Sequence, residues 1–66
     1  MAVVKVIELL AQSDKSWEDA AQEAVNAAAK SVRNIRTIYI ENLQGIVKDG
    51  KISEYRVDAK VSFVVE

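Results

Sequence analysis

An Asp-Gly pair at residues 49 and 50 separates two stretches that are rich in β-branched and aromatic residues. Both central residues of a type I′ hairpin turn need positive φ, and Asp-Gly is a pair that this turn selects. After the turn, apolar residues alternate with polar ones. One face of this segment carries Ser53, Tyr55, Val57, Ala59, Val61, Phe63 and Val65. A period of two is typical of a strand with one buried face, so the sequence predicts a long β-hairpin over residues 35–65.

The N-terminal segment Ala2–Leu10 is almost continuously apolar and rich in β-branched residues, with only Lys5 and Glu8 interrupting it. A short run of this kind favours a strand over a helix. A polar link over residues 11–15 follows. The sequence therefore predicts a first strand that ends near Leu10.

A helix is predicted from about Trp17 to Val32. Ser16 is a favoured N-cap residue, and the acids that follow Trp17 suit the positive end of the helix dipole. Asn34 is expected to end the helical segment. The apolar positions recur with a period of 3.6 residues; they are Trp17, Ala20, Ala21, Ala24, Val25, Ala28 and Val32.

The order of these elements is strand, helix, strand, strand. A right-handed crossover through the helix carries the chain from the first strand to the second. The third strand then inserts between the first two, antiparallel to both. The predicted fold class is therefore α+β, a β-α-β-β arrangement with sheet order 1-3-2 and the helix on one face.

The two-residue turn also predicts the register of the hairpin, because Lys48 then pairs with Lys51. Counting back from this pair places Ile40 opposite Ala59 and Ile38 opposite Val61, which suits a core-facing row. The same count places three polar residues in that row, and we expect a bulge near Gly45 to change the phase. These polar placements are Arg36 opposite Phe63, Asn42 opposite Val57 and Gln44 opposite Tyr55.

The hairpin is longer than the helix that should cover it. Arms of about 13 residues span roughly 43 Å, whereas a helix of about 16 residues spans roughly 24 Å. Apolar residues near the tip are left uncovered, namely Leu43, Ile46, Val47 and Ile52. The face away from the helix is predicted to carry Ile35, Tyr39, Leu43 and Val47. A 66-residue chain without Cys has no disulfide to stabilise it, so we expect self-association.

Composition excludes several kinds of function. The chain has no Cys and no His, which removes thiolate zinc sites, imidazole ligands and Ser-His nucleophile pairs. The net charge of −1 without a basic run does not indicate a nucleic-acid partner. No stretch approaches the roughly 20 apolar residues of a membrane span, and no signal peptide is recognisable. We expect a cytoplasmic, non-enzymatic protein.

Five segments, in order, resemble the dodecin family. They are Lys5-Val6-Ile7-Glu8, Ser16-Trp17-Glu18-Asp19-Ala20, Asn34-Ile35-Arg36, Lys48-Asp49-Gly50-Lys51 and Lys60-Val61-Ser62-Phe63. The resemblance covers nearly the whole chain and implies one dodecin-like domain over residues 1–66. It also implies a hollow homododecamer with cubic symmetry, which stores or sequesters riboflavin or FMN between subunits without turnover.

The resemblance places a flavin site at Thr37, Gln44 and Arg56, and the alternation of the strand adds Tyr39 to it. Thr37 stands where flavin-binding members have a Trp that stacks on the flavin ring, and Thr has no π-face. Arg56 stands where the family often has Gln, and Arg donates hydrogen bonds but does not accept them. Gln44 stands where Arg is frequent. Tyr39 shares a strand face with Thr37 and offers an aromatic surface.

Two functions remain open from the sequence. The first is a store for flavin or another flat ligand at subunit junctions, with Arg56 beside Thr37 holding an anionic group. The second is a dodecin-like assembly that has lost flavin binding and serves as a structural or calcium-binding particle. No metal ligands are assigned.

The remaining polar and aromatic features favour structural roles. Glu18, Asp19 and Glu23 favour helix capping, since no calcium-loop spacing is present. Trp17 is expected to pack against the sheet. The alternating charges of the third strand, with those of the second, favour cross-strand ion pairs; they are Glu41, Glu54, Arg56, Asp58 and Lys60.

Overall fold

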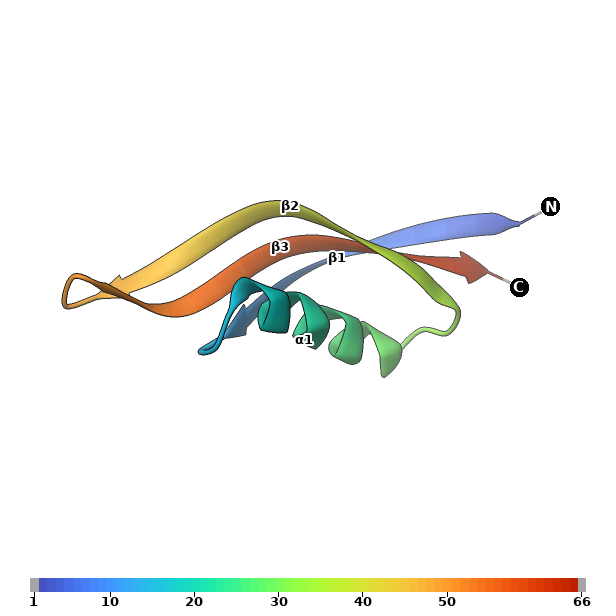
Figure 1. The fold of residues 1–66 in the computed structure, drawn as a ribbon. Helices are drawn as coiled ribbons and strands as arrows, with labels where there is room; N and C mark the ends of the chain where they lie inside the picture. Colours follow the sequence, from blue (N-terminus) through green and yellow to red (C-terminus); the bar gives the residue numbers. More distant parts are fainter. Residues whose placement is uncertain (1, 66) are drawn as a thin grey trace.

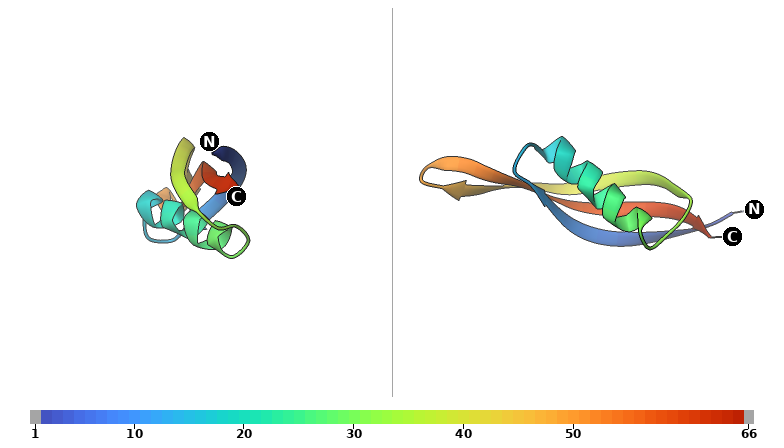
Figure 2. Two further views of the ribbon diagram at one scale, coloured as in Figure 1. Left: turned by 90° about the vertical axis from the view of Figure 1, so that its right-hand side faces the viewer. Right: turned by 90° about the horizontal axis from the view of Figure 1, so that it is seen from below.

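The computed structural model describes residues 2–65. Its elements are β1 (Val3–Ser13), α1 (Trp17–Ala29), β2 (Ile35–Lys48) and β3 (Lys51–Val65). The three strands form one antiparallel sheet in the order β1-β3-β2, and α1 lies across one face of it (Figures 1 and 2). This confirms the α+β fold and the sheet order that the sequence predicts. No helix among residues 2–65 is long and apolar enough to cross a membrane.

The turn between β2 and β3 has the predicted backbone. Asp49 has φ 54° and Gly50 has φ 77°, so both central residues adopt the positive φ that a type I′ turn needs. Lys48 pairs with Lys51, as expected from a two-residue loop. The turn therefore fixes the start of the hairpin register.

The start of α1 is as predicted, and its end is earlier. The Ser16 hydroxyl oxygen accepts a hydrogen bond from the backbone N–H of Asp19 at 2.9 Å, which satisfies one of the free amides of the first turn. The helix ends at Ala29, three residues before the predicted Val32. The left-handed conformation of Asn34, with φ 61°, then leads the chain into β2.

Small side chains bring α1 close to the sheet. The helix residues Ala20, Ala24 and Ala28 are at most 2% exposed, and they share the core with three fully buried residues of β3. These are Val57, Ala59 and Val61. Since β3 is the central strand, its alternating apolar face lies under the helix, as the alternation predicts.

β1 is three residues longer than predicted and ends at Ser13. The first three residues of the expected polar link, 11–13, pair with β3 instead; the pairs are Ala11 with Val57, Gln12 with Arg56, and Ser13 with Tyr55. Polar side chains suit an edge strand whose outer face meets water. The polar residues after Leu10 therefore belong to an edge strand and not to the predicted link.

The predicted β2–β3 register is correct in the centre of the sheet and wrong on either side of the centre. Ile40 lies opposite Ala59 and Ile38 opposite Val61, as predicted. The three polar residues expected in the core-facing row are each replaced by a neighbour. Ile35 lies opposite Phe63, Leu43 opposite Val57, and Gly45 opposite Tyr55.

β-bulges are the physical reason for these differences. The register shifts between Ile35 and Thr37, between Ile40 and Asn42, and between Ile46 and Val47. Each bulge adds one unpaired residue to one strand and changes which side chains face the helix. The result is an apolar row toward α1 and a polar row toward solvent. The bulge expected near Gly45 lies between Ile46 and Val47, and Gly45 itself is regularly paired with Tyr55.

The hairpin extends well beyond α1 and β1 (Figure 1). The molecule measures 51 × 19 × 13 Å. Past the last β1 pair, Ser13 with Tyr55, residues 46–54 form a two-stranded ribbon, which we call the overhang. The length mismatch between hairpin and helix is therefore confirmed.

Most of the apolar residues predicted on the outer face lie on the helix side. A Cβ on Gly45 would stand 3.4 Å from the Ile52 side chain, which places Ile52 and its partner Val47 on that side. Leu43 and Ile35 share this face, because they pair with Val57 and Phe63. Among the predicted set only Tyr39 lies on the outer face.

Candidate metal centre on the outer sheet face

Three carboxylates, one from each strand, meet on the sheet face away from α1. Glu8 comes from β1, Glu41 from β2 and Asp58 from β3, and their ligand oxygens all lie within 4.8 Å of one another. We call this group the outer carboxylate cluster. The bulge between Ile40 and Asn42 contributes Glu41 as its extra residue, so a departure from regular pairing supplies one of the three groups.

The outer carboxylate cluster lacks a hydrogen-bond donor for one buried oxygen. Oδ1 of Asp58 is buried and has no hydrogen-bond partner among residues 2–65. The pKa of Glu8 is raised above 4.5, first by a side-chain hydrogen bond with Asp58 and then by the negative charge of Asp58. When both groups are ionised neither can donate to the other. The cluster therefore favours a bound proton or a bound cation.

Lys60 neutralises part of this negative charge. Its Nζ lies 2.9 Å from Oε1 of Glu41. The hydrogen bond to Glu41, and then its charge, raise the pKa of Lys60. The ion pair predicted from the alternating charges is thus confirmed for these two residues. Because both side chains are more than a third exposed, the pair contributes little to stability.

The donor set of the outer carboxylate cluster fits a hard divalent cation. Ca²⁺ takes six to eight oxygen ligands at about 2.3–2.6 Å, so oxygens on opposite sides of the ion lie about 5 Å apart. Three carboxylates offer up to six oxygens, and one ligand oxygen from each of the three lies within 4.8 Å of the other two. No nitrogen or sulfur ligand is needed for such a site. The arrangement can hold Ca²⁺, with water completing its shell.

The raised pKa of Glu8 predicts a pH dependence of stability without metal. A carboxyl whose pKa is higher in the folded state binds its proton more tightly there, so stability falls as pH rises from 4.5 through the raised value. The Glu8→Gln variant removes this titration. Thermal unfolding is measured from pH 4 to pH 8 with a chelator present. Over this range the melting temperature of the variant is expected to fall less than that of the wild type. Equal losses would contradict the interaction of Glu8 with Asp58.

Two residues of the predicted flavin site, Thr37 and Tyr39, lie on the outer face of β2. Thr37 lies opposite Ser62, and the two hydroxyl groups share a hydrogen bond. Tyr39 lies opposite Lys60 and is 64% exposed. The expectation that these residues share a strand face is confirmed. Tyr39 is also the aromatic ring most exposed to solvent on that face.

The other two residues of the predicted site, Gln44 and Arg56, pair with each other across β2 and β3. The Arg56 guanidinium donates to Oε1 of Gln12, with Nε at 2.7 Å. Arg56 is six residues from Ser62 along β3, which corresponds to about 20 Å. Within one chain Arg56 therefore does not lie beside Thr37, and the two can share a ligand only if they come from different chains.

Trp17 is a packing residue at the start of α1, as predicted. Its ring meets Tyr55 edge to face, with centroids 4.7 Å apart. Its Nε1 donates to the backbone carbonyl of Gln44 at 2.9 Å. Trp17 also lines an apolar cleft of about 280 Å³ together with Glu18, Ala21, Ile40, Leu43 and Val57. The ring thus ties the helix to both strands of the hairpin.

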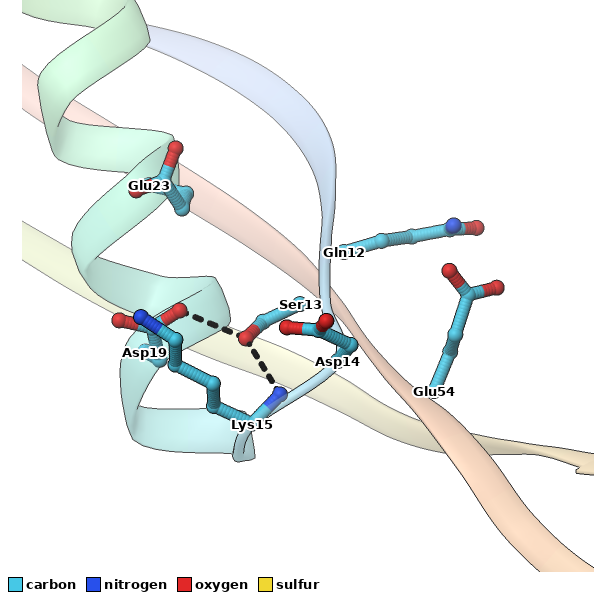
Figure 3. A pocket seen from close by; sticks show the side chains of 7 residues that line it. All are labelled: Gln12, Ser13, Asp14, Lys15, Asp19, Glu23 and Glu54. Atoms are coloured by element: carbon cyan, nitrogen blue, oxygen red, sulfur yellow. Dashed lines mark hydrogen bonds between the residues drawn. The ribbon is translucent and has the colours of Figure 1, made fainter.

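The acids of the helix start lie in a separate pocket of about 440 Å³ (Figure 3). Asp19 accepts a hydrogen bond from the Ser13 hydroxyl at 2.6 Å, and that hydroxyl accepts one from the backbone N–H of Lys15 at 2.9 Å. These bonds join the Asp19 side chain to the end of β1 and not to a free amide of the helix, whose cap is Ser16. We call this space the acidic pocket; it is lined by Gln12, Ser13, Asp14, Lys15, Asp19, Glu23 and Glu54.

Sequence reasoning assigned none of the three carboxylates of the outer carboxylate cluster as a metal ligand, and it did not bring Glu8 near the other two. Glu41 and Asp58 both belong to the hairpin, and the predicted register already places them opposite each other. Glu8 joins them through the pairing of β1 with β3, in which Glu8 lies opposite Lys60. No turn links β1 to β3, so the sequence holds no local signal for that register.

Comparisons with a family model and with known proteins point to the same family. A family model described as Dodecin matches residues 3–66. The chain is 45% identical over 64 residues to the calcium dodecin of Mycobacterium tuberculosis, covering 96% of this chain and 89% of the relative. It is 30% identical over 64 residues to the dodecin of Thermus thermophilus, and the match covers 97% of this chain and 93% of that relative.

Solved structures show the same fold. A crystal structure of a Thermus thermophilus protein superposes with a TM-score of 0.94 at 29% identity, covering 100% of this chain and 97% of that one. The mycobacterial calcium dodecin, described as a calcium-chelating antigen with a novel calcium-binding site, superposes with a TM-score of 0.83 at 38% identity, covering 97% and 91%. Since the family match spans residues 3–66 and a 45% identical relative is itself a dodecin, the chain belongs to the dodecin family.

Proposed function

We propose that this chain is a non-enzymatic, calcium-binding dodecin that assembles as a homododecamer. The observation that carries the proposal is the outer carboxylate cluster, in which a buried oxygen of Asp58 faces two further carboxylates without a donor. The 45% identical mycobacterial relative is named a calcium dodecin. The shared family and the shared chemistry of oxygen ligands support Ca²⁺ as the first candidate.

Each residue of the outer carboxylate cluster has a distinct part in the proposed binding. Asp58, on the central strand, supplies the buried oxygen and the most fixed position. Glu8 and Glu41 approach from the two edge strands. Lys60 holds Glu41 at 2.9 Å, so it competes with the ion for this carboxylate. Binding offsets the repulsion between the Glu8 and Asp58 carboxylates, which, after their side-chain hydrogen bond, is the second cause of the raised pKa of Glu8.

A calcium titration of thermal stability tests the proposal. Ligand at 100 times its dissociation constant stabilises the folded state by about 2.7 kcal/mol, so the melting temperature of the wild type is expected to rise with Ca²⁺. The Asp58→Asn variant is expected to lose most of this rise. Glu54→Gln is the matched control, because Glu54 lies on the same strand outside the cluster. A full rise in Asp58→Asn, or an equal loss in Glu54→Gln, would contradict the site.

Flavin binding through Thr37, Tyr39, Gln44 and Arg56 remains the competing function. Tyr39 supports it, since its ring is 64% exposed and available for stacking. Thr37 opposes it, because its hydroxyl group is engaged with Ser62 and it offers no ring. With Arg56 about 20 Å from Thr37 along the sheet, the four residues do not converge within one chain. We therefore place flavin second to calcium.

A fluorescence titration separates the two functions. The wild type is expected to leave riboflavin fluorescence unquenched, whereas Thr37→Trp is expected to quench it by restoring an aromatic face at the exposed position. Thr37→Val is the control for loss of the hydroxyl group. Quenching by the wild type would favour the flavin function, and no quenching by Thr37→Trp would show that the missing ring does not explain the loss.

A further inference from the structure

An ammonium group already occupies one side of the outer carboxylate cluster. Nζ of Lys60 lies 2.9 Å from Oε1 of Glu41, a distance typical of a charge-assisted hydrogen bond. A metal ion bound to all three carboxylates would need the Glu41 group that Lys60 holds, since one oxygen from each carboxylate lies within 4.8 Å of the other two. The Lys60 ammonium therefore supplies part of the positive charge that a bound ion would bring.

The strand register explains why Lys60 meets the cluster. On β3, Lys60 is two residues from Asp58, so both side chains leave the sheet on the same face. Lys60 lies opposite Glu8 of β1 and opposite Tyr39 of β2, and residues directly opposite each other have Cβ atoms about 5 Å apart. The bulge in β2 then brings Glu41 within reach of the ammonium. Lys60 is thus a neighbour of all three carboxylates.

The charge of this group of four side chains matches a divalent ion. Three ionised carboxylates and one ammonium carry three negative charges and one positive charge, which is a formal net charge of −2. A divalent cation neutralises this charge, whereas a trivalent cation leaves an excess positive charge. Without Lys60 the formal charge would be −3, which suits a trivalent cation. The residue at position 60 therefore bears on which cations the cluster prefers.

Lys60 can release Glu41 without disturbing the sheet. The side chains of Lys60 and Glu41 are 42% and 36% exposed, and exposed ion pairs contribute little to stability. Lys also has a flexible stem, so an incoming ion can displace its ammonium toward solvent. Oδ1 of Asp58, in contrast, is buried and has no hydrogen-bond partner among residues 2–65. The competition is therefore directed at the exposed ligand and not at the buried one.

We propose that Lys60 determines the affinity and the charge selectivity of the outer carboxylate cluster, as an internal cation that holds Glu41 until a divalent ion displaces it. This inference rests on the proposed calcium site and deepens it. Removing the ammonium removes both a competitor for Glu41 and a charge that repels the ion. The repulsion is proportional to the charge of the ion, so the removal favours a trivalent cation more than a divalent one.

Calcium and terbium titrations of a Lys60→Met variant, followed by calorimetry at constant ionic strength, test the inference. The variant is expected to lower the dissociation constant of Ca²⁺ about tenfold and that of Tb³⁺ about thirtyfold. Lys60→Arg retains the charge, so both constants are expected to stay within about twofold of the wild type. Lys5→Met is the matched control. It is the same substitution on β1, but Lys5 pairs with Phe63 on the helix-side face, and both constants are expected to be unchanged.

The outcomes separate this inference from the proposed function. Calcium binding by the wild type that Lys60→Met leaves unchanged or weakens would overturn the role of Lys60 and leave the calcium site standing. An equal gain in Lys5→Met would overturn it as well, because net charge alone would then set the affinity. Equal gains for Ca²⁺ and Tb³⁺ would overturn the charge selectivity. Binding by Lys60→Met and not by the wild type would support Lys60 as the competitor and contradict the proposed function, and no binding by either would overturn both.

Discussion

The Ala24→Leu variant is expected to lose about 3 kcal/mol of unfolding free energy, at the upper end of the range for overpacking. Ala24 is 1% exposed, and its side chain shares a core cluster with the fully buried Val57 and Ala59 of β3. The added methylene groups have no room unless α1 moves away from the sheet, which would expose both strand residues. A domain of this size has only a few kcal/mol in reserve, so the variant should be mostly unfolded well below the wild-type midpoint.

Ala27→Leu is the control for this substitution. Ala27 lies on the same helix and is exposed, so the change there should stay within about 0.5 kcal/mol. Urea unfolding followed by circular dichroism measures both variants. Similar midpoints for Ala24→Leu and Ala27→Leu would contradict the close approach of helix and sheet.

The Trp17→Ala variant is expected to lose about 3 kcal/mol, the lower end for replacing a large aromatic residue, because Trp17 is only partly buried. The substitution removes the edge-to-face contact with Tyr55 at 4.7 Å and the hydrogen bond to the Gln44 carbonyl. The start of α1 would then lose its attachment to the hairpin.

Trp17→Phe separates the two contributions of this side chain. Phe retains a ring against Tyr55 and loses only the hydrogen bond, which is worth about 1 kcal/mol. Thermal unfolding of both variants is expected to give a clearly smaller decrease for Phe than for Ala. Equal decreases would mean that ring packing does not hold the helix start.

The features that the sequence predicts correctly are those with a local physical signal. The Asp-Gly turn, the alternation of β3 and the Ser16 cap each depend on residues that are neighbours in the chain. From them follow the element order and the central place of β3. The register in the middle of the hairpin, at Ile40 and Ile38, agrees with the count from the turn because the shift between Ile46 and Val47 is reversed by the shift between Ile40 and Asn42.

The features that the sequence does not predict depend on single unpaired residues or on distant strands. A bulge at Glu41 changes the phase of β2 without any Gly or Pro to mark it, and it places Leu43 rather than Asn42 toward the core. The end of α1 at Ala29 leaves Val32 outside the helix, although Val32 continues the apolar spacing. Spacing alone therefore extended the predicted helix too far.

The candidate site also combines residues that a local signal brings together with one that depends on a distant strand. Glu41 and Asp58 are brought together by the hairpin, whose turn is visible in the sequence. Glu8 reaches them only because β1 pairs with β3 in a register that brings its carboxylate beside theirs. The charge pattern predicted an ion pair with Lys60, and the third carboxylate makes the arrangement a candidate cation site instead of an ion pair alone.

Anomalous scattering is the most direct measurement of the proposed calcium site. Crystals grown with Ca²⁺, or with Tb³⁺ as a stronger scatterer of similar ligand preference, would locate the ion without reference to stability. An anomalous peak is expected among the oxygens of Glu8, Glu41 and Asp58, which lie within 4.8 Å of one another, and should be absent from crystals of Asp58→Asn. A peak confined to other residues, or none at a saturating ion concentration, would contradict the proposed function.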